Sequence, residues 1–460
     1  MLKDKAKQFH IYLPIETKGR EYLSKLYLTT HLAREKYDVV IGERGQLYKL
    51  SPFLKPGVFI EKSIGFTGLN KFKKLKSLGN CILAWDEEGL VFHPEVYKFS
   101  LRDELIKLCD VFFAWGENHK KVLEKYFRGK DVDLILCGNP RVDIIPYLKP
   151  RKDVEKPMIL FNDNFGPYNH YHGYDHYKKR IETYVYGRPN KSEIDKEKVE
   201  KIIMEEVKIK KILFNIFIDA IRKTSKFFPD ANIVVRPHPS SNVDTIQERL
   251  NDLENVKVCN EDTVEKWILA SDAVVHSGCT TGLQAFMLNK PVFALIDDNH
   301  LNPSETLPNL VSDKVKDIDI LIKKLESAIE GTYNPECDDL SRHEKIQILQ
   351  KHIYGIKENQ DGKITGRACK IITDYITKNY KSKRSSDSIS PTVYFNRLKY
   401  FFLLPKILIQ LNRIKKNSYR RQKFPGITIS EIKKDLSKFS NKKYKVKKMY
   451  NDVFQISSME

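Results

Sequence analysis

The sequence ANIVVRPHP at residues 231–239 is a short apolar run followed at once by a turn with two prolines. Similar apolar runs that end in polar or small residues occur at 158–165 (MILFNDNF), 272–278 (DAVVHSG) and 290–296 (KPVFALI). Residues 178–228, which precede ANIVVRPHP, are rich in Lys and Glu and have a mainly helical pattern. Short strands that are bounded by turn residues and separated by helices predict a mostly parallel, doubly wound sheet.

The first 150 residues show the same alternation. The pattern REYLSKLYLTTHLAREK (20–36) is typical of the helical stretches between the apolar runs, and a charged, Pro-containing linker follows at 147–157. We expect strands at HIYLPI (10–15), YDVVIG (37–42), GVFIEK (57–62), CILAW (81–85), VFFAWG (111–116) and LILCG (134–138).

These patterns predict an α/β protein with two doubly wound, Rossmann-like domains that face a crevice, and a basic helical C-terminal extension. Ligands of such domains bind at the carboxyl ends of the strands. The expected divisions are a first Rossmann-like domain at 1–150, a second at 157–335, helices that cross back to the first domain at 336–385, and the extension at 386–460.

Composition excludes several classes of protein. With 460 residues, of which 41% are hydrophobic, the chain can bury the cores of two or three domains and is not wholly disordered. It has no run of eighteen apolar residues and no apolar leader at its N-terminus, so we expect neither a spanning helix nor a secretory signal. The seven cysteines form no CxxC pair, which indicates reduced core thiols in a cytoplasmic protein.

Basic charge is concentrated near the C-terminus. Residues 381–460 contain 20 Lys and Arg against 5 Asp and Glu, so they carry +15 of the net charge of +20. Aromatic and aliphatic residues alternate with Lys and Arg over 391–425, so we expect residues 391–450 to bind an anionic membrane surface. A helical extension that packs its apolar side on the body is the alternative. Specific binding of nucleic acid is not expected, because no recognition motif accompanies the basic residues.

The strongest signal for function is RPHPSS at 236–241, directly after an expected strand. The two prolines restrict the turn, so His238 is presented at the carboxyl end of the strand with little freedom. A fixed imidazole beside Arg236 suits a phosphate group, and Pro239 and Ser240 belong to the same candidate site. A capped turn with a structural histidine is the alternative.

A second signal is HSGCTTG at 276–282, between an expected strand and an expected helix. Unpaired backbone N–H groups at a helix start attract anions, so this segment can receive a phosphate together with His238. Simple helix capping by Ser and Thr is the alternative. The candidate phosphate-binding residues are Ser277, Gly278, Thr280 and Thr281.

Three consecutive carboxylates occur in WDEEG at 85–89. Like charges at a strand end repel one another, so the pKa of a part-buried carboxylate there can rise into the range of a general base. Glu87 and Glu88 are the candidates, and a solvated acidic turn is the alternative.

Weaker candidates lie at other strand ends. Asp163 in NDNF is a candidate nucleophile or sugar-binding carboxylate, although an Asx turn explains it equally well. Glu16, Lys18 and Arg20 follow the first expected strand and are candidates for binding an acceptor, with surface ion pairs as the alternative. His170, His172 and His176 lack a Cys or Glu at convincing spacing, so we predict no metal site.

Taken together, these motifs resemble those of bacterial surface-carbohydrate biosynthesis proteins of the GT-B type. In particular they are similar to transferases that use CMP-activated sialic, legionaminic or Kdo-type sugars. The resemblance covers roughly residues 10–380 and rests on Glu87-Glu88-Gly89, on His238-Pro239, and on Ser277 with Thr280-Thr281.

The resemblance implies an enzyme whose N-terminal domain binds the acceptor and whose C-terminal domain binds the nucleotide sugar. Glu87 or Glu88 would be the general base, and His238 would contact the phosphate of CMP. The Ser/Thr segment would complete the phosphate site without a divalent metal. In related capsule transferases that retain configuration, Asp163 would be a candidate nucleophile.

Two other enzyme classes remain open from the sequence. A CDP-polyol phosphotransferase of the teichoic-acid type also carries RxHP-like histidines and would release CMP. A UDP-sugar-using GT-B enzyme, either a transferase or a 2-epimerase, has the same expected fold. The nucleotide that binds distinguishes these alternatives.

Overall fold

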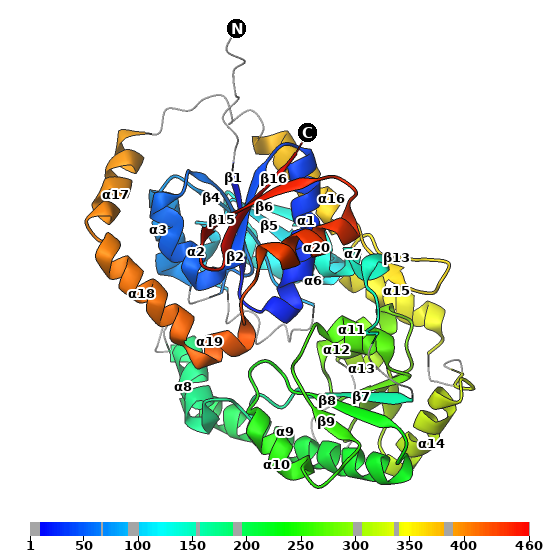
Figure 1. The fold of residues 1–460 in the computed structure, drawn as a ribbon. Coiled ribbons are helices and arrows are strands. Elements are labelled where there is room, and N and C mark those ends of the chain that lie inside the picture. The colour runs from blue at the N-terminus through cyan, green and yellow to red at the C-terminus, as the bar shows by residue number, and fades with distance from the viewer. Residues whose placement is uncertain are drawn as a thin grey trace. The chain divides into compact units, whose positions relative to one another are not determined.

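The computed structural model describes residues 10–65, 68–90, 101–152, 157–186, 196–297, 306–334, 340–380 and 390–459. The chain forms two compact units (Figure 1). Unit 1 comprises residues 1–147, 349–357 and 365–460, and unit 2 comprises residues 148–348 and 358–364.

Unit 2 is built on a six-stranded sheet with the order β12-β11-β10-β7-β8-β9, all of whose pairings are parallel. Read from the other edge, its strands follow the chain order 3-2-1-4-5-6 of dinucleotide-binding domains, which reverses between β7 and β10. The strands are β7 (Met158–Asn162), β8 (Asn232–Arg236), β9 (Val256–Val258), β10 (Ala273–His276), β11 (Val292–Leu295) and β12 (Asp313–Val315).

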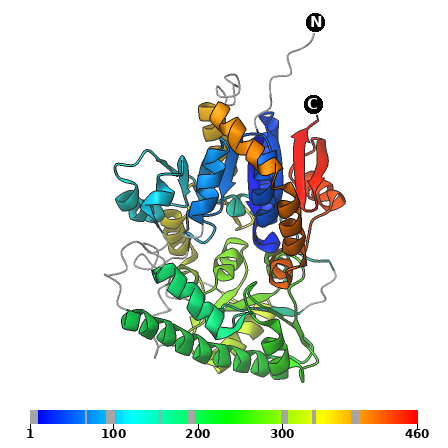
Figure 2. The same cartoon turned by 90° about the vertical axis from the view of Figure 1, so that its left-hand side faces the viewer.

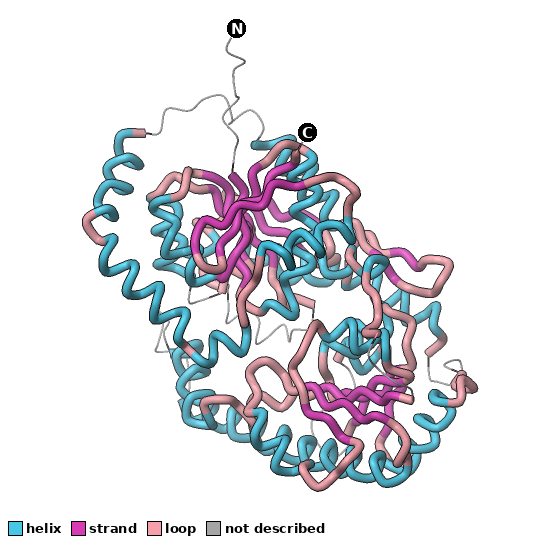
Figure 3. Tube along the Cα trace, viewed as in Figure 1, coloured by secondary structure: helices cyan, strands magenta, loops and turns pink. Residues whose placement is uncertain are grey.

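The helices of unit 2 alternate with these strands and surround the sheet (Figure 3). Phe161 of the central strand and Phe165 just after it pack edge to face on Phe217 of a long helix, with ring centroids 5.5 and 5.2 Å away. The helices are α8 (Gly173–Tyr186), α9 (Lys196–Phe227), α10 (Val243–Leu250), α11 (Val264–Ala270), α12 (Thr280–Met287), α13 (Leu307–Leu310), α14 (Ile318–Ile329) and α15 (Arg342–His352), whose last turn belongs to unit 1.

Unit 1 contains an eight-stranded sheet with the order β15-β16-β2-β1-β3-β4-β5-β6. Its first six strands are parallel and follow the order 2-1-3-4-5 and onward, the other common doubly wound arrangement. They are β1 (His10–Ile15), β2 (Asp38–Glu43), β3 (Gly57–Glu61), β4 (Cys81–Trp85), β5 (Val111–Ala114) and β6 (Asp133–Leu136). Every residue of β1 is buried, as expected for a central parallel strand covered on both faces.

Helices from both ends of the chain cover this sheet. α1 contacts α7, α16 and α20, so residues after 365 return to the first unit. The helices are α1 (Lys18–Arg34), α2 (Arg44–Leu50), α3 (Leu69–Ser77), α5 (Asp103–Ile106), α6 (Glu117–Phe127), α7 (Pro140–Asp143), α16 (Ala368–Tyr380), α17 (Pro391–Phe401), α18 (Leu404–Lys416), α19 (Ser418–Lys423) and α20 (Ile429–Phe439). A two-stranded ladder of β13 (Lys357–Glu358) and β14 (Ile364–Thr365) lies where the chain passes between units.

The end of the chain differs from the predicted extension. β15 (Tyr444–Tyr450) and β16 (Val453–Ser458) form a hairpin, and β16 pairs antiparallel with β2 at the edge of the sheet. The exposed lysines of β15 belong to an edge strand, where they oppose pairing with another chain. Residues 365–460 all belong to unit 1, and the hairpin at 444–458 extends its sheet.

The predicted fold class of two doubly wound α/β sheets with parallel strands is confirmed. In the part of the chain that the structure describes, no helix combines the length and apolarity needed to cross a membrane.

Candidate functional site

Three polar loops of unit 2 follow three neighbouring parallel strands, β10, β7 and β8. Asn162 at the end of β7 lies opposite His276 of β10 and Arg236 of β8. The carboxyl ends of parallel strands meet at one edge of the sheet, and ligands bind where the chain order reverses, here between β7 and β10. The structure therefore brings the predicted NDNF, RPHPSS and HSGCTTG segments together at the expected edge.

Asp163 ties the first two of these loops together. Its Oδ1 accepts a hydrogen bond from the backbone N–H of Phe165 (2.7 Å), and its Oδ2 accepts one from the backbone N–H of His238 (3.1 Å). The side chain is 2% exposed. With both oxygens bound to backbone groups, Asp163 fits the Asx-turn interpretation and positions the loop that carries His238, and this geometry gives no support to a nucleophile.

His238 is held in one orientation by its own turn. Its Nδ1 accepts a hydrogen bond from the backbone N–H of Ser240 (3.2 Å) and lies 2.7 Å from the Ser240 Oγ. Because Nδ1 is an acceptor, the neutral ring carries its hydrogen on Nε2, which acts as the donor. The loop is braced further by the hydrogen bond from the backbone N–H of Tyr171 to the carbonyl oxygen of Ser240 (2.8 Å). Pro239 lies between His238 and Ser240, the residue that holds the ring.

The side chain of Arg236 is engaged by groups of its own unit. Its guanidinium donates to the carbonyl oxygens of Glu261 (2.5 Å) and Asp262 (3.1 Å) and lies over the ring of Trp267, 5.7 Å from the centroid. Burial lowers the pKa of this group. The side chain thus fastens β8 to the loop before α11, and the phosphate-binding role expected for Arg236 finds no support in these contacts.

The HSGCTTG segment forms the start of α12. The backbone N–H of Cys279 donates to the Nδ1 of His276 (3.3 Å), and that of Gly282 donates to the carbonyl oxygen of Cys279 (3.0 Å). The helix start therefore attracts an anion mainly through its dipole. Gly278 has a φ of +69°, and its carbonyl oxygen accepts a hydrogen bond from Nδ2 of Asn164 (3.1 Å). Ser277 is buried, while Thr280 and Thr281 are half-buried at the helix start. The position at a helix start is compatible with an anion, and the phosphate-binding role of these residues stays a prediction.

The buried ring of His276 supports this segment through its contacts with Cys279 and Gly282. The ring is fully buried, its Nδ1 accepts from the backbone N–H of Cys279 (3.3 Å), and its Nε2 lies 2.8 Å from the Oγ of Ser312. Burial lowers the pKa of His276 to about 3, so the ring is neutral. A Cβ at Gly282 would lie 2.2 Å from the Nε2 of His276, so this glycine is needed for the helix to pass over the ring.

Two polar groups near these loops were not predicted from the sequence. The Nδ2 of Asn162 is buried and has no hydrogen-bond partner among the described residues, so it is a donor that a ligand can satisfy. Lys210 of α9 lies over the ring of Phe165, 6.0 Å from the centroid, and interacts electrostatically with Glu206 most strongly, and also with Cys279 and Asp163. Burial lowers the pKa of Lys210. Lys210 places an ammonium group near this edge of the sheet. Because its helix contains many Lys and Glu residues, the sequence pattern does not single out this lysine.

The histidines at 170, 172 and 176 lie beside this site. Their ring centroids are 4.6 to 5.9 Å apart, and the Nδ1 of His170 accepts from the backbone N–H of His172 (3.1 Å). His170 also forms an isolated bridge with Ser241, which joins this loop to the RPHPSS loop. Across the described residues, no group of three His, Cys, Asp or Glu side chains has the geometry to hold a metal ion.

In unit 1, Glu87 is the buried member of the predicted carboxylate pair. Its Oε1 accepts from the Nε1 of Trp85 (2.8 Å) and lies 3.6 Å from the Nζ of Lys25. Its Oε2 is buried and has no partner among the described residues. Glu87 is 4% exposed, so its position is set by packing and by these two contacts.

Glu88 is placed differently. Its side chain is 69% exposed and pairs with the Nη1 of Arg20 (3.1 Å), and its backbone N–H donates to Oδ1 of Asp86 (3.0 Å). An exposed ion pair of this kind contributes little to stability. Of the two carboxylates, Glu87 therefore has the fixed position that a general base requires, and Glu88 has the greater freedom.

A buried ion pair that the sequence analysis missed supports Glu87. Lys25 of α1 is fully buried and donates to Oε2 of Glu21 (2.7 Å) and to the carbonyl oxygen of Pro14 (2.5 Å). Burial alone would raise the pKa of Glu21, but neighbouring cations, with Lys25 the strongest, lower it to about 2. A lysine on the apolar side of a helical pattern, four residues after a glutamate, was the available signal.

The residues predicted to bind an acceptor are largely engaged within unit 1. Glu16 lies 2.9 to 3.2 Å from the cationic groups of Lys62, Arg44 and Lys423. Lys18 donates to the carbonyl oxygen of Gly426 (2.7 Å) and pairs with Glu431 of α20 (2.7 Å). These contacts fit the ion-pair interpretation for Glu16 and Lys18, which fasten the C-terminal segment to the carboxyl end of β1. Arg20 remains beside Glu88.

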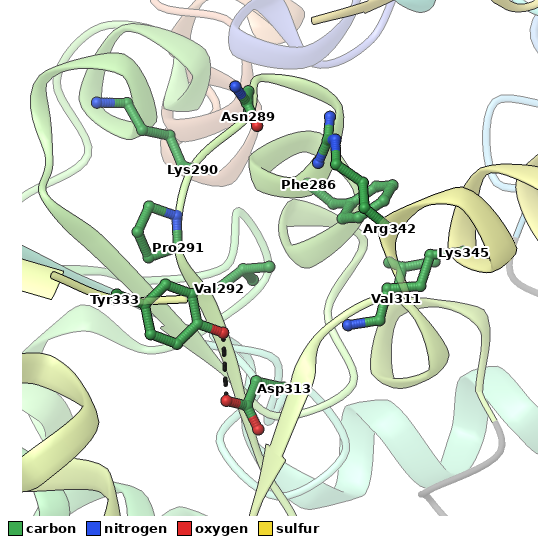
Figure 4. Close-up of a pocket in the computed structure, with 10 residues that line it drawn as sticks. All are labelled: Phe286, Asn289, Lys290, Pro291, Val292, Val311, Asp313, Tyr333, Arg342 and Lys345. Atoms are coloured by element: carbon green, nitrogen blue, oxygen red, sulfur yellow. Dashed lines mark hydrogen bonds between the residues drawn. The ribbon is translucent and has the colours of Figure 1, made fainter. Parts of the chain in front are cut away.

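A small cavity of unit 2 lies away from the motif loops (Figure 4). Its volume is about 200 Å³, and Val292 and Asp313, the first residues of β11 and β12, line it. The hydroxyl of Tyr333 donates to Oδ2 of Asp313 across it (3.2 Å). Because it opens at the amino ends of the strands, this cavity is not the site formed by the three loops.

Comparison with known proteins gave a limited result. No protein-family model matches the sequence, and no curated protein matches it. Among solved structures, a Listeria monocytogenes protein described as a UDP-N-acetylglucosamine 2-epimerase shares 12% identity at a TM-score of 0.48, with 83% of this chain and 100% of that chain covered. A Staphylococcus aureus MnaA–UDP structure shares 14% identity at a TM-score of 0.47 and covers 83% and 99% of the two chains. The wall teichoic acid polymerase TagF shares 14% identity at a TM-score of 0.45 and covers 83% and 90%.

Proposed function

We propose that this protein is a glycosyltransferase that moves a CMP-activated nonulosonic or ulosonic acid, of the sialic, legionaminic or Kdo type, onto a surface polysaccharide or glycolipid. The observation that carries the proposal is the turn of His238. Its Nδ1 is occupied by the backbone N–H of Ser240, which makes Nε2 a fixed donor at the carboxyl end of β8. That edge of the sheet also holds the uncapped start of α12.

On the donor side, unit 2 supplies the groups that a single phosphate needs. In a CMP-sugar the bond that breaks joins the anomeric carbon to a phosphate oxygen, and its electron pair leaves with CMP. The Nε2–H of His238 and the positive end of the α12 dipole stabilise that growing charge, and Lys210, which also interacts with Glu206, adds a nearby ammonium group. These groups do the work for which other transferases use a divalent metal, so we propose that activity persists in the presence of EDTA.

On the acceptor side, unit 1 supplies a base. The acceptor hydroxyl forms the new bond to the anomeric carbon and gives its proton to a carboxylate. We assign this role to Glu87, whose Oε1 is fixed by Trp85 while its Oε2 has no partner among the described residues. Arg20, paired with Glu88 at the same strand end, is the candidate that remains for contact with an acidic acceptor.

Two alternatives share the same site. A CDP-polyol phosphotransferase would bind a diphosphate at the same loops and also release CMP. A UDP-sugar transferase or 2-epimerase would need a uracil-specific pocket and a second phosphate contact, for which Lys210 is a candidate. We place both behind the CMP-sugar proposal because Glu87-Glu88-Gly89, His238-Pro239 and the Ser/Thr segment together resemble the motifs of CMP-sugar transferases.

The experiment is a nucleotide panel on the full-length protein. A ligand that binds only the folded state raises the midpoint of thermal unfolding with its occupancy, so CMP, CDP, UMP, UDP and GDP are compared at equal concentration. A shift with CMP that His238→Ala removes and His343→Ala keeps supports the proposal, since His343 is an exposed histidine of α15. A shift with CDP alone favours the phosphotransferase, and one with UDP alone favours the UDP-sugar enzyme.

A further inference from the structure

Helices α17 and α18 run along one side of unit 1 (Figure 2) and are attached to it by a few specific contacts. The guanidinium of Arg397 donates to the carbonyl oxygens of Leu78 (2.6 Å) and Pro52 (3.2 Å), and the Nδ2 of Asn396 donates to that of Ser77 (3.1 Å). On α18, Ile407 and Leu411 are buried, and the helix contacts α2. One face of the helix pair is thus docked on the body of the unit.

The exposed side chains of this helix pair are largely apolar. Nine of the fifteen exposed large hydrophobic side chains among the described residues fall within the sixteen positions from 394 to 409. Phe402 is 88% exposed and Phe395 is 62% exposed. Monomeric soluble proteins rarely expose so many aromatic and aliphatic groups together. We define this apolar face by Tyr394, Phe395, Leu398, Phe401, Phe402, Leu403, Leu404, Leu408 and Ile409.

The segment that carries the apolar face contains basic residues and no acidic ones. Residues 388–430 contain no Asp or Glu, and the exposed residues Lys399, Lys406 and Arg413 lie on the same two helices. On the neighbouring α3, Lys74 lies over the ring of Tyr400, 4.7 Å from the centroid, and burial together with a nearby lysine lowers its pKa to about 8. A positive potential around an apolar patch selects a surface that is both apolar and negatively charged.

These features favour one occupant over the others. In a two-fold contact between copies, the same patch meets itself, so the helices with no carboxylate would face their own positive charge. An acidic protein partner would match the charge but would leave the most exposed aromatic side chains without a deep apolar environment. An anionic bilayer offers phosphate groups for the cations and acyl chains for the aromatic side chains.

We infer that the apolar face of α17 and α18 binds the surface of an anionic lipid bilayer. The two helices lie in the interface, with Phe395 and Phe402 inserted below the headgroups and Lys399, Lys406 and Arg413 at headgroup level. Arg397 and Asn396 keep the helices fixed to unit 1. This inference is independent of the proposed transferase activity, because it needs no donor and no acceptor.

Flotation of the full-length protein with lipid vesicles tests it. Vesicles of phosphatidylcholine alone are compared with an equal mixture of phosphatidylcholine and phosphatidylglycerol. We expect binding to the mixed vesicles that weakens with added salt and falls at least tenfold in the double variant Phe395→Ser, Phe402→Ser. Phe227→Ser removes an exposed phenylalanine of unit 2 and should bind as the parent does.

A charge variant separates the two contributions. Lys399→Gln with Lys406→Gln and Arg413→Gln should lose the preference for phosphatidylglycerol, whereas Lys107→Gln with Lys121→Gln and Lys125→Gln, exposed lysines elsewhere on unit 1, should keep it. All substituted side chains are exposed, so unfolding midpoints should match that of the parent. Equal flotation of the parent and the double phenylalanine variant would overturn the inference. A parent that floats with neither vesicle, and whose dimer in light scattering is lost in that variant, would assign the face to a second copy instead.

Discussion

The Nζ of Lys25 and the Oε1 of Glu87 lie 3.6 Å apart in a part of unit 1 that solvent does not reach. Lys25 comes from α1 and Glu87 from the turn after β4, so this pair joins two segments at the carboxyl edge of the sheet. The indole of Trp85 donates to the same carboxylate oxygen, and the second oxygen is buried and has no partner among the described residues. The acceptor side of the proposed reaction depends on this arrangement.

The substitution Glu87→Gln keeps the shape and the indole contact but removes the base. We expect kcat for release of CMP from a CMP-sugar to fall by about 100-fold or more, with affinity for CMP unchanged. Glu88→Gln is the matched control and should change kcat only a few-fold, because that side chain is exposed. If Glu88→Gln causes the large loss and Glu87→Gln does not, the assignment of the base is reversed.

Removing Lys25 should destabilise the fold. The Lys25→Met variant fills a similar volume but leaves the carboxylates of Glu21 and Glu87 buried without their cation. A broken buried pair costs about 3–5 kcal/mol, which urea unfolding followed by circular dichroism will measure. Lys370→Met, in the exposed pair with Asp374, should have a much smaller effect. Similar losses in the two variants would show that Lys25 is not part of a buried network.

Stability should fall as the pH drops below about 6.5. Burial lowers the pKa of both His119 and His276 from 6.5 to about 3. Between pH 6.5 and 3 these histidines therefore bind protons in the unfolded chain but not in the folded one. Their contribution to the free energy of unfolding is complete above pH 6.5 and is lost as the pH falls toward 3. Each histidine adds a slope of about 1.4 kcal/mol per pH unit to the free energy of unfolding. The slope should decrease by one histidine's share in His119→Gln, and an unchanged slope would contradict the neutral, buried state of that ring.

Gly282→Ala should damage the phosphate-binding segment. The added Cβ would lie 2.2 Å from the Nε2 of His276, and that fully buried ring has no room to move. We expect a lower unfolding midpoint and loss of stabilisation by CMP. Gly68→Ala, where the nearest atom would lie 3.5 Å from the new Cβ, is the matched control and should behave as the parent does. A normal midpoint for Gly282→Ala would mean that α12 can shift to accommodate the methyl group.

The strand ends that carry the site were predictable because parallel strands buried on both faces are short apolar runs with sharp polar ends. NIVV before His238 and DAVVH before Ser277 show this directly, and the order of the strands then brings their loops together. The direction of the Arg236 side chain was not predictable, because its partners are backbone carbonyl oxygens more than twenty residues away.

Two other features were hidden in the sequence for different reasons. In YKVKKMY the lysines of an exposed edge strand obscure the alternation of β15, so the sequence pattern predicts a basic extension where the structure has a hairpin. Lys210 is one of many lysines on α9, and only the packing of that helix on Phe165 distinguishes it. The role of a charged residue depends on its tertiary contacts, and a local sequence pattern does not show these.

The most direct test of the central claim is the affinity of CMP for the full-length protein, measured by calorimetry for the parent and for His238→Ala, with His343→Ala as the control. A hydrogen bond to a charged phosphate is worth about 1.5–3 kcal/mol, so the account predicts that His238→Ala weakens CMP binding by about 10- to 100-fold while the control leaves it unchanged. Equal affinity of CMP for the parent and for His238→Ala would contradict it.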